Sequence, residues 1–174
     1  MTKLGILVAM AVECRSLTEQ KIPGNGLLAL NECCLIGLSG AGPKAAQRGS
    51  ALLIEAGATA MISWGCAAAL DPRLNPGDLI LPESLVGIDR RLINVDGLWR
   101  ERLVSLLESR LSVHSGLLAE SSRIVALEGE KRAIFADTGA IALDMESAAS
   151  ARAAEQFGLP FLAIRSIIDP ASVT

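Results

Sequence analysis

The stretch from residue 35 to residue 65 limits the possible folds more than any other part of the chain. It reads LIGLSGAGPKAAQRGSALLIEAGATAMISWG, with two apolar runs on either side of an Ala- and Leu-rich segment. Gly40 and Gly42 indicate a tight turn, and Pro43 suits the first turn of a helix. Short apolar runs bounded by turn residues are typical of buried strands. The stretch therefore predicts a strand, a turn, a helix and a second strand.

The rest of the chain continues this alternation of strands and helices. We expect strands at 4–10, within 27–40, at 79–86 with a break at Pro82, and at 116–120, 140–145 and 159–167. We expect further helices at 97–111, 128–139 and 146–158, with apolar spacing or a closing glycine as evidence. At 174 residues the chain is predicted to form one α/β domain, 1–174, with a mostly buried sheet. No helix is expected after the last strand, so we expect a partner to cover one face or the chain to be C-terminally truncated.

Composition excludes several classes of function. The net charge of −3 argues against broad nucleic-acid binding, although a small anionic ligand needs only a few local donors. Hydrophobic residues make up 51% of the chain, but no run approaches the ~18 apolar residues of a membrane span. We expect reduced thiols in a cytoplasmic protein, because none of the cysteines forms a CxxC pair. His114 is the only histidine, so we predict no metal site and a strand-end or surface role for it.

The segment LDMES places two carboxylates in an otherwise apolar region. Asp144 and Glu146 flank Met145 there. A buried charge is costly unless something pairs with it, so these residues are candidates for a functional site.

Three stretches resemble the purine nucleoside phosphorylase and methylthioadenosine nucleosidase superfamily, in the same order along the chain. They are GILVAMAVE at 5–13, SGAGPKAAQRGSALLIEAGATAMISWGCAAALDPRLNPGDLILP at 39–82, and ALDMESAASARAAEQFGLPFLAIRSIIDP at 142–170. The resemblance implies a three-layer α/β/α sandwich with a mixed central sheet that lacks the final helix. It also implies a homo-oligomer, no cofactor or metal, and inorganic phosphate as co-substrate if the protein is a phosphorylase.

The resemblance assigns the main catalytic and ribose-binding roles. Glu146 is expected to accept hydrogen bonds from the ribose hydroxyls, and Met145 to pack against the sugar. Asp169 is expected to hold or donate a proton at the N7 edge of the purine, which needs a carboxyl with a raised pKa. Glu13 matches the residue that activates water in the nucleosidases.

The remaining roles concern the nucleophile, the base and the support of the site. Arg15, Gly40 and Cys66 are expected to bind phosphate or another nucleophile. The predicted base pocket consists of Ala67, Ala68, Ile124 and Val125. Asp144 is expected to support the site from behind, and Arg165 to form an orienting ion pair with Asp144 or Glu146.

Some of these residues depart from the family pattern. Cys66 replaces a serine, and Ala67, Ala68 and Ala69 follow it where relatives have glycines. Ile168 replaces the serine that helps to orient the aspartate, and Ile124 and Val125 stand where many relatives have a stacking aromatic residue.

Three functions remain open from the sequence. The first is phosphorolysis of an adenine nucleoside, because ECR at 13–15, DMES at 144–147 and GLPFLAIR at 158–165 look most like the hopanoid-biosynthesis-associated phosphorylases, expected to act on adenosylhopane. The second is hydrolysis of methylthioadenosine or S-adenosylhomocysteine. The third is a catalytically impaired nucleoside-binding protein.

Overall fold

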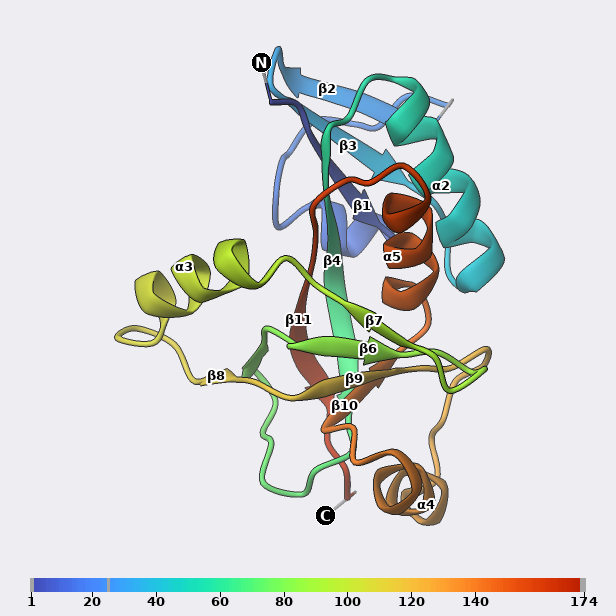
Figure 1. Ribbon diagram of the computed structural model, residues 1–174, viewed down its shortest axis with the longest axis vertical. Helices are drawn as coiled ribbons and strands as arrows, with labels where there is room; N and C mark the ends of the chain where they lie inside the picture. The colour runs from blue at the N-terminus through green and yellow to red at the C-terminus, as the bar shows by residue number, and fades with distance from the viewer. Residues whose placement is uncertain (1, 25, 173–174) are drawn as a thin grey trace.

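The computed structural model describes residues 2–24 and 26–172, in which strands and helices alternate along most of the chain (Figure 1). The strands are β1 (Leu4–Val8), β2 (Leu27–Asn31), β3 (Cys34–Leu38), β4 (Ala60–Ala69), β5 (Leu79–Ile80), β6 (Ser84–Val86), β7 (Leu92–Asn94), β8 (Val113–His114), β9 (Leu117–Glu120), β10 (Ala142–Asp144) and β11 (Phe161–Asp169). The helices are α1 (Ala11–Cys14), α2 (Pro43–Glu55), α3 (Gly97–Leu107), α4 (Glu128–Thr138) and α5 (Ser147–Gln156).

Strand β4 lies at the centre of the sheet. It pairs in parallel with β1 along its first half and with β11 along most of its length, and it pairs antiparallel with β10 at its end. From β1 the sheet continues to β3 and β2, and from β10 it continues to β9, β6 and β7. Parallel and antiparallel pairs are both present, so the predicted mixed sheet is confirmed.

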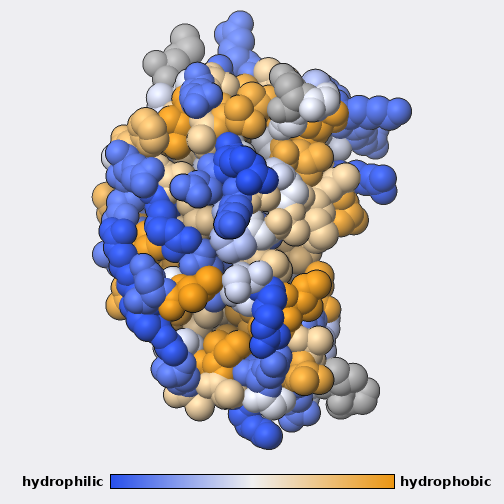
Figure 2. Space-filling model, turned by 90° about the vertical axis from the view of Figure 1, so that its right-hand side faces the viewer, coloured by the Kyte–Doolittle hydropathy of each residue, from blue (hydrophilic) through white to orange (hydrophobic). Residues whose placement is uncertain are grey.

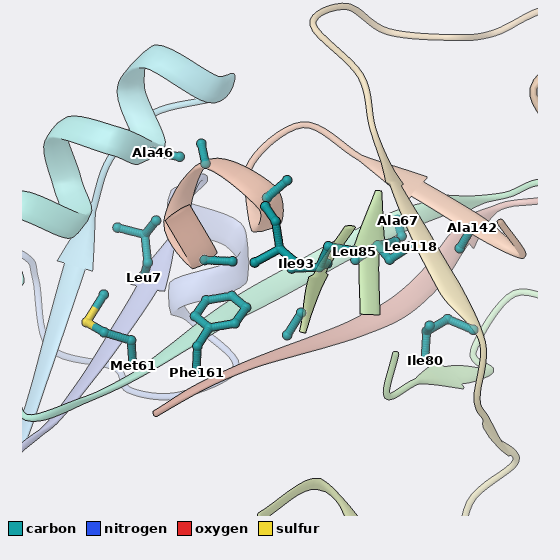
Figure 3. Close-up of a cluster of buried hydrophobic side chains, with 14 of the residues drawn as sticks. Leu7, Ala46, Met61, Ala67, Ile80, Leu85, Ile93, Leu118, Ala142 and Phe161 are labelled. Atoms are coloured by element: carbon teal, nitrogen blue, oxygen red, sulfur yellow. The ribbon is translucent and has the colours of Figure 1, made fainter. Parts of the chain in front are cut away.

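Helices cover both faces of this sheet. On one face, α2 and α5 pack on each other and on a cluster that includes Leu7, Met61 and Phe161 (Figure 3). On the other face, Trp99 and Leu103 of α3 pack against a second cluster, to which α1 also contributes. Helix α4 covers a third, smaller cluster near β9 and β10. The predicted α/β/α layering is therefore confirmed.

The predicted elements are correct in type, and the differences lie in short elements and element ends. The run 4–10 is one strand in the prediction, but β1 ends at Val8 and the helix α1 begins at Ala11. Helix α3 ends at Leu107, four residues before the predicted end, and Leu106 and Leu111 are exposed. The sequence does not predict β7 or β8, because strands of three and two residues are too short to show a hydrophobic period.

The structure also tests the predictions from composition. The four cysteines are free thiols, and His114 ends strand β8, with its Nε2 atom 3.1 Å from Asp78 Oδ2. In the described residues no helix is long and apolar enough to cross a membrane, and no cluster of three His, Cys, Asp or Glu residues is suited to a metal ion. On the face shown in Figure 2, hydrophilic side chains separate several apolar patches.

Candidate active site

A cavity of about 280 Å³ opens where β1, β4, β10 and β11 come together. It is lined by residues 9–10, 13, 41, 66–68, 123–125, 143–146 and 168–169. Ligands of open α/β sheets bind beyond the carboxyl ends of strands, and residues that follow β1, β10 and the end of β11 lie here. The cavity is therefore in the position where this fold favours a ligand.

Most of the side chains that the sequence predicts for the site line this cavity. They are Glu13, Cys66, Ala67, Ala68, Ile124, Val125, Asp144, Met145, Glu146 and Asp169. Three predicted residues, Arg15, Gly40 and Arg165, do not line it.

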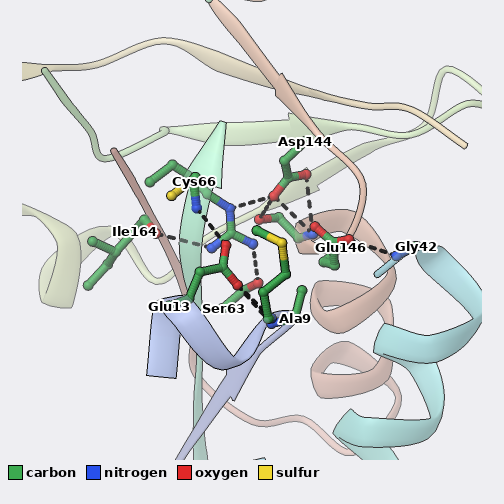
Figure 4. A network of polar contacts seen from close by, with 11 residues as sticks. Ala9, Glu13, Gly42, Ser63, Cys66, Asp144, Glu146 and Ile164 are labelled. Atoms are coloured by element: carbon green, nitrogen blue, oxygen red, sulfur yellow. Dashed lines mark hydrogen bonds and ion pairs between the residues drawn. The ribbon is translucent and has the colours of Figure 1, made fainter. Parts of the chain in front are cut away.

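Glu13 is held firmly by the backbone. Its Oε2 atom accepts hydrogen bonds from the N–H groups of Ala9 (3.0 Å) and Met10 (2.9 Å), and its Oε1 atom accepts one from Cys66 (3.0 Å). The side chain is 8% exposed. Three amide donors fix the orientation of the carboxylate at the cavity wall (Figure 4).

The position of Glu13 depends on a glycine in β4. A Cβ atom built on Gly65 lies 2.3 Å from Glu13 Oε1 and 2.8 Å from its Cδ. No side chain fits between the strand and the carboxylate, so glycine at this position allows Glu13 to bond the backbone of the next residue, Cys66. Burial raises the pKa of the Cys66 thiol, and the Glu13 carboxylate adds to this effect, so the thiol is protonated at neutral pH.

Glu146 directly precedes α5, and it lines the cavity (Figure 4). Its Oε1 atom accepts a hydrogen bond of 2.7 Å from the N–H of Gly42, in the loop before α2. Burial raises the pKa of Glu146. The carboxylates of Asp144 and Glu13 raise it further, while the Gly42 N–H and Arg165 act in the opposite direction. Met145, the preceding residue, also lines the cavity.

Asp144, in the cavity lining, forms a buried ion pair with Arg165, which lies outside the lining. Arg165 Nε lies 2.6 Å from Asp144 Oδ2, and both side chains are 2% exposed. The guanidinium also donates to Ser63 Oγ and to the carbonyl of Ile164, while Asp144 accepts hydrogen bonds from Ser147. The donors of Arg165 point to protein partners, so the pair joins β4, β10 and β11 beneath the site.

Asp169 lies at the end of β11, after an irregularity in its pairing with β4. Its side chain is 43% exposed and lines the cavity. Its Oδ1 atom lies 2.7 Å from the Nζ of Lys131, a residue of α4 that is 1% exposed. The preceding residue, Ile168, points outward at the cavity mouth with most of its side chain exposed.

The predicted base pocket is aliphatic and half open. Ala67 and Val125 are buried, whereas Ile124 is 78% exposed. Arg123, beside them, lines the cavity but forms an ion pair with Glu130 at 2.8 Å.

The local backbone explains why Arg15 and Gly40 lie outside the cavity lining. Arg15 could bind a nucleophile beside Glu13 if both residues stood on a strand or turn, where residues two apart can face one pocket. Glu13 lies instead on helix α1, and Arg15 directly follows it with a helical backbone. On a helix, residues two apart point about 200° away from each other, so Arg15 is exposed. The N–H of Gly40 donates to the carbonyl of Ala9, so this donor is already used within the protein.

The sequence interpretation did not identify Lys131 or Ser63 as parts of the site. No pattern in the sequence marks Ser63 as a site residue, because its hydroxyl contacts Arg165 only through the pairing of β4 with β11. Lys131 does have a signal. It occupies the same helical face as Ile134 and Phe135, which pack on the core, so a lysine interrupts an apolar stripe.

Comparisons with known proteins identify the family of this chain. The family model described as the phosphorylase superfamily matches residues 3–174. Similar solved structures include the 5′-methylthioadenosine/S-adenosylhomocysteine nucleosidase of Helicobacter pylori in complex with butyl-thio-DADMe-Immucillin-A (24% identity, 99% of this chain and 87% of that chain, TM-score 0.87). The corresponding nucleosidase of Neisseria meningitidis, in complex with methylthio-immucillin-A, is also similar (22% identity, 98% and 87% covered, TM-score 0.85).

A third similar structure is the futalosine hydrolase of Helicobacter pylori (23% identity, 98% of this chain and 86% of that chain, TM-score 0.85). At these identities the solved structures show a shared fold. The family match spans nearly the whole chain. The protein therefore belongs to the phosphorylase superfamily, whose members cleave the N-ribosidic bond of nucleosides.

Proposed function

We propose that this protein hydrolyses the N-ribosidic bond of an adenine nucleoside. The observation that carries this proposal is the Glu13 carboxylate, which three backbone N–H groups hold at the cavity wall. A fixed carboxylate can accept a proton from water as the water attacks the sugar, which is general base catalysis.

The other carboxylates suit the charges that develop in this reaction. Bond cleavage leaves positive charge on the ribose and negative charge on the purine. Glu146, which lines the same cavity as Glu13, can accept hydrogen bonds from the ribose hydroxyls and stabilise the positive charge. Asp169, which also lines the cavity, can carry the proton that the leaving purine requires.

The charges around the cavity favour water over phosphate as the nucleophile. Four carboxylates line the cavity, and two of them, Asp144 and Asp169, are paired with cations behind the lining. Arg123 is the one lysine or arginine among the described lining residues, and it is paired with Glu130. Phosphate binding requires cationic or backbone donors that are free to bind it. The predicted phosphate ligand Arg15 is exposed outside the lining, which supports hydrolysis rather than phosphorolysis.

The mouth of the cavity suits a nucleoside with an apolar substituent. Met10, Ile124 and Ile168 line the cavity and are 41%, 78% and 60% exposed. Exposed apolar side chains gathered at one opening are typical of a ligand-binding surface. We therefore propose an adenine nucleoside with an apolar 5′ group, such as methylthioadenosine or an adenosylhopane-like compound.

The test is to measure adenine release from methylthioadenosine and adenosine in buffer without phosphate. We expect release by the wild-type protein, with methylthioadenosine preferred over adenosine, and a loss of at least about 100-fold in kcat for Glu13→Gln. The matched control is Glu19→Gln, a substitution at an exposed position outside the cavity.

Two results would contradict the proposal. Release that requires phosphate would support phosphorolysis, the activity that the resemblance to hopanoid-associated phosphorylases favours. Binding of these nucleosides without any release, in either buffer, would support a nucleoside-binding protein.

A further inference from the structure

Lys131 is an unusual residue for its position in the fold. It belongs to α4, is 1% exposed, and shares a helical face with Ile134 and Phe135, which pack on the core. A buried ammonium is costly unless it is paired, and an apolar residue often stabilises such a position equally well. The lysine therefore suggests a role beyond packing.

The contacts of Lys131 connect it to the cavity. Its Nζ donates to Asp169 Oδ1 at 2.7 Å and to the carbonyl of Pro170 at 2.6 Å. Within residues 2–24 and 26–172, it is the one residue that hydrogen-bonds to the Asp169 side chain. Ile168, the residue before Asp169, has an apolar side chain that offers no hydrogen bond.

Lys131 approaches the carboxylate from behind. Asp169 lines the cavity and is 43% exposed, while Lys131 is absent from the lining. One carboxylate oxygen, Oδ1, is therefore fixed by the ammonium. The geometry leaves Oδ2 for a ligand.

We propose that Lys131 is a positioning residue for proton transfer to the leaving purine, an inference that rests on the proposed function. The bond between the ribose C1′ and the purine N9 breaks, and its electron pair moves to the purine. Asp169 takes up a proton from solvent on Oδ2 as substrate binds, and this proton moves to N7 of the purine as the bond breaks. The carboxylate that forms returns to the ion pair seen in the structure, in which the Lys131 ammonium compensates its negative charge without giving up its own proton. Water adds to C1′ and transfers a proton to Glu13.

This role predicts a dependence on the leaving group. Adenine leaves slowly without a proton, whereas 4-nitrophenolate is a stable anion that leaves unprotonated. Loss of the Lys131 charge should therefore slow release of adenine and spare release of 4-nitrophenolate from its riboside. A purely structural role would slow both reactions equally.

The experiment compares Lys131→Met, Lys131→Gln and Lys131→Arg with wild type on methylthioadenosine and on 4-nitrophenyl riboside. We expect Lys131→Met to lower kcat for methylthioadenosine by about 100-fold with KM changed less than about threefold. We expect its kcat for the nitrophenyl riboside to stay within about threefold of wild type. Lys131→Arg, which keeps the charge, should recover part of the lost activity. Arg132→Met, at an exposed neighbour on α4, should match wild type on both substrates.

Lys131→Gln keeps a hydrogen-bond donor without the charge and serves if Lys131→Met does not fold. Equal losses on both substrates, a loss expressed in KM alone, or full activity of a folded Lys131→Met or Lys131→Gln variant would overturn the role of Lys131. A folded wild-type protein that cleaves neither substrate would instead contradict the proposed function itself.

Discussion

The backbone N–H of Gly42 donates a hydrogen bond of 2.7 Å to the Oε1 atom of Glu146, although the two residues are 104 positions apart in the sequence. Gly42 precedes α2 and Glu146 precedes α5, and these two helices pack on each other. Their contact includes a hydrogen bond of 3.0 Å between the hydroxyls of Ser50 and Ser150. The helix pair therefore sets the position of the carboxylate that we assign to ribose binding.

Substitution Glu146→Gln tests this assignment. The amide oxygen of Gln can still accept the Gly42 hydrogen bond, but the variant lacks the negative charge that stabilises a cationic sugar. We expect kcat/KM for methylthioadenosine to fall by about 100-fold or more, measured by adenine release. An active Glu146→Gln variant would contradict the assignment.

The same substitution should change how stability depends on pH. Burial raises the pKa of Glu146 in the folded protein above the usual value of about 4.3. A carboxyl with a raised folded pKa contributes stability that is present below the unfolded pKa and is lost as pH rises through the folded pKa. At pH 7, Glu146 therefore makes the wild-type protein less stable than it is at low pH. The Gln side chain does not ionise, so the stability of Glu146→Gln lacks this dependence on pH.

We expect the Tm of Glu146→Gln to exceed that of wild type at pH 7, and the difference to shrink as the pH falls toward 4. Thermal unfolding followed by circular dichroism at several pH values measures this, with Glu19→Gln as the exposed control. A Tm difference that grows as the pH falls would contradict a raised pKa of Glu146 in the folded protein.

Gly65→Ala should impair activity through Glu13. The added Cβ lies 2.3 Å from Glu13 Oε1, so the carboxylate must move away from the Cys66 N–H. Because a displacement of about 1 Å in a catalytic group can cost about 100-fold, we expect a fall of roughly that size in kcat. Gly129→Ala on α4 is the matched control, since nothing lies within 4 Å of its added Cβ. Equal kcat values for the two variants would show that activity does not depend on the space that Gly65 leaves for Glu13.

Asp144→Ala should destabilise the fold. It leaves the guanidinium of Arg165 buried without its carboxylate, which costs about 3–5 kcal/mol in the free energy of unfolding. Glu155→Ala breaks the exposed ion pair with Arg91 and should cost no more than about 1 kcal/mol. Urea titrations of the two variants give these values. A cost below about 1 kcal/mol for Asp144→Ala would mean that the buried pair is not a structural support.

The main elements of the fold could be predicted from the sequence because their patterns are strong. The run around β4 is apolar, and α2 begins at Pro43. Helix α4 ends at Thr138 and is followed by Gly139, whose left-handed conformation favours glycine. Helix α1 could not be predicted, because its four residues are too few to show a period and the preceding Met10 is not a typical N-cap residue. That short helix determines where Arg15 points. Because the helix is not predicted, the sequence indicates phosphate binding for Arg15, whereas the structure leaves Arg15 exposed outside the cavity lining.

The candidate site could be predicted in part for a similar reason. Glu13, Glu146 and Asp169 stand in stretches that resemble a known family, and all three line one cavity. Their partners could not be predicted, because contacts such as that of Lys131 with Asp169 depend on how α4 packs against the end of β11. The sequence shows that a lysine interrupts an apolar stripe, but the identity of its partner requires the tertiary structure.

Identification of the sugar product tests the central claim most directly. The protein is incubated with methylthioadenosine in a buffer that contains inorganic phosphate, and the products are separated and identified by mass spectrometry. Water attack, assisted by Glu13, predicts adenine and the free methylthioribose sugar even with phosphate present. Formation of the sugar 1-phosphate would contradict hydrolysis and show that phosphate is the nucleophile.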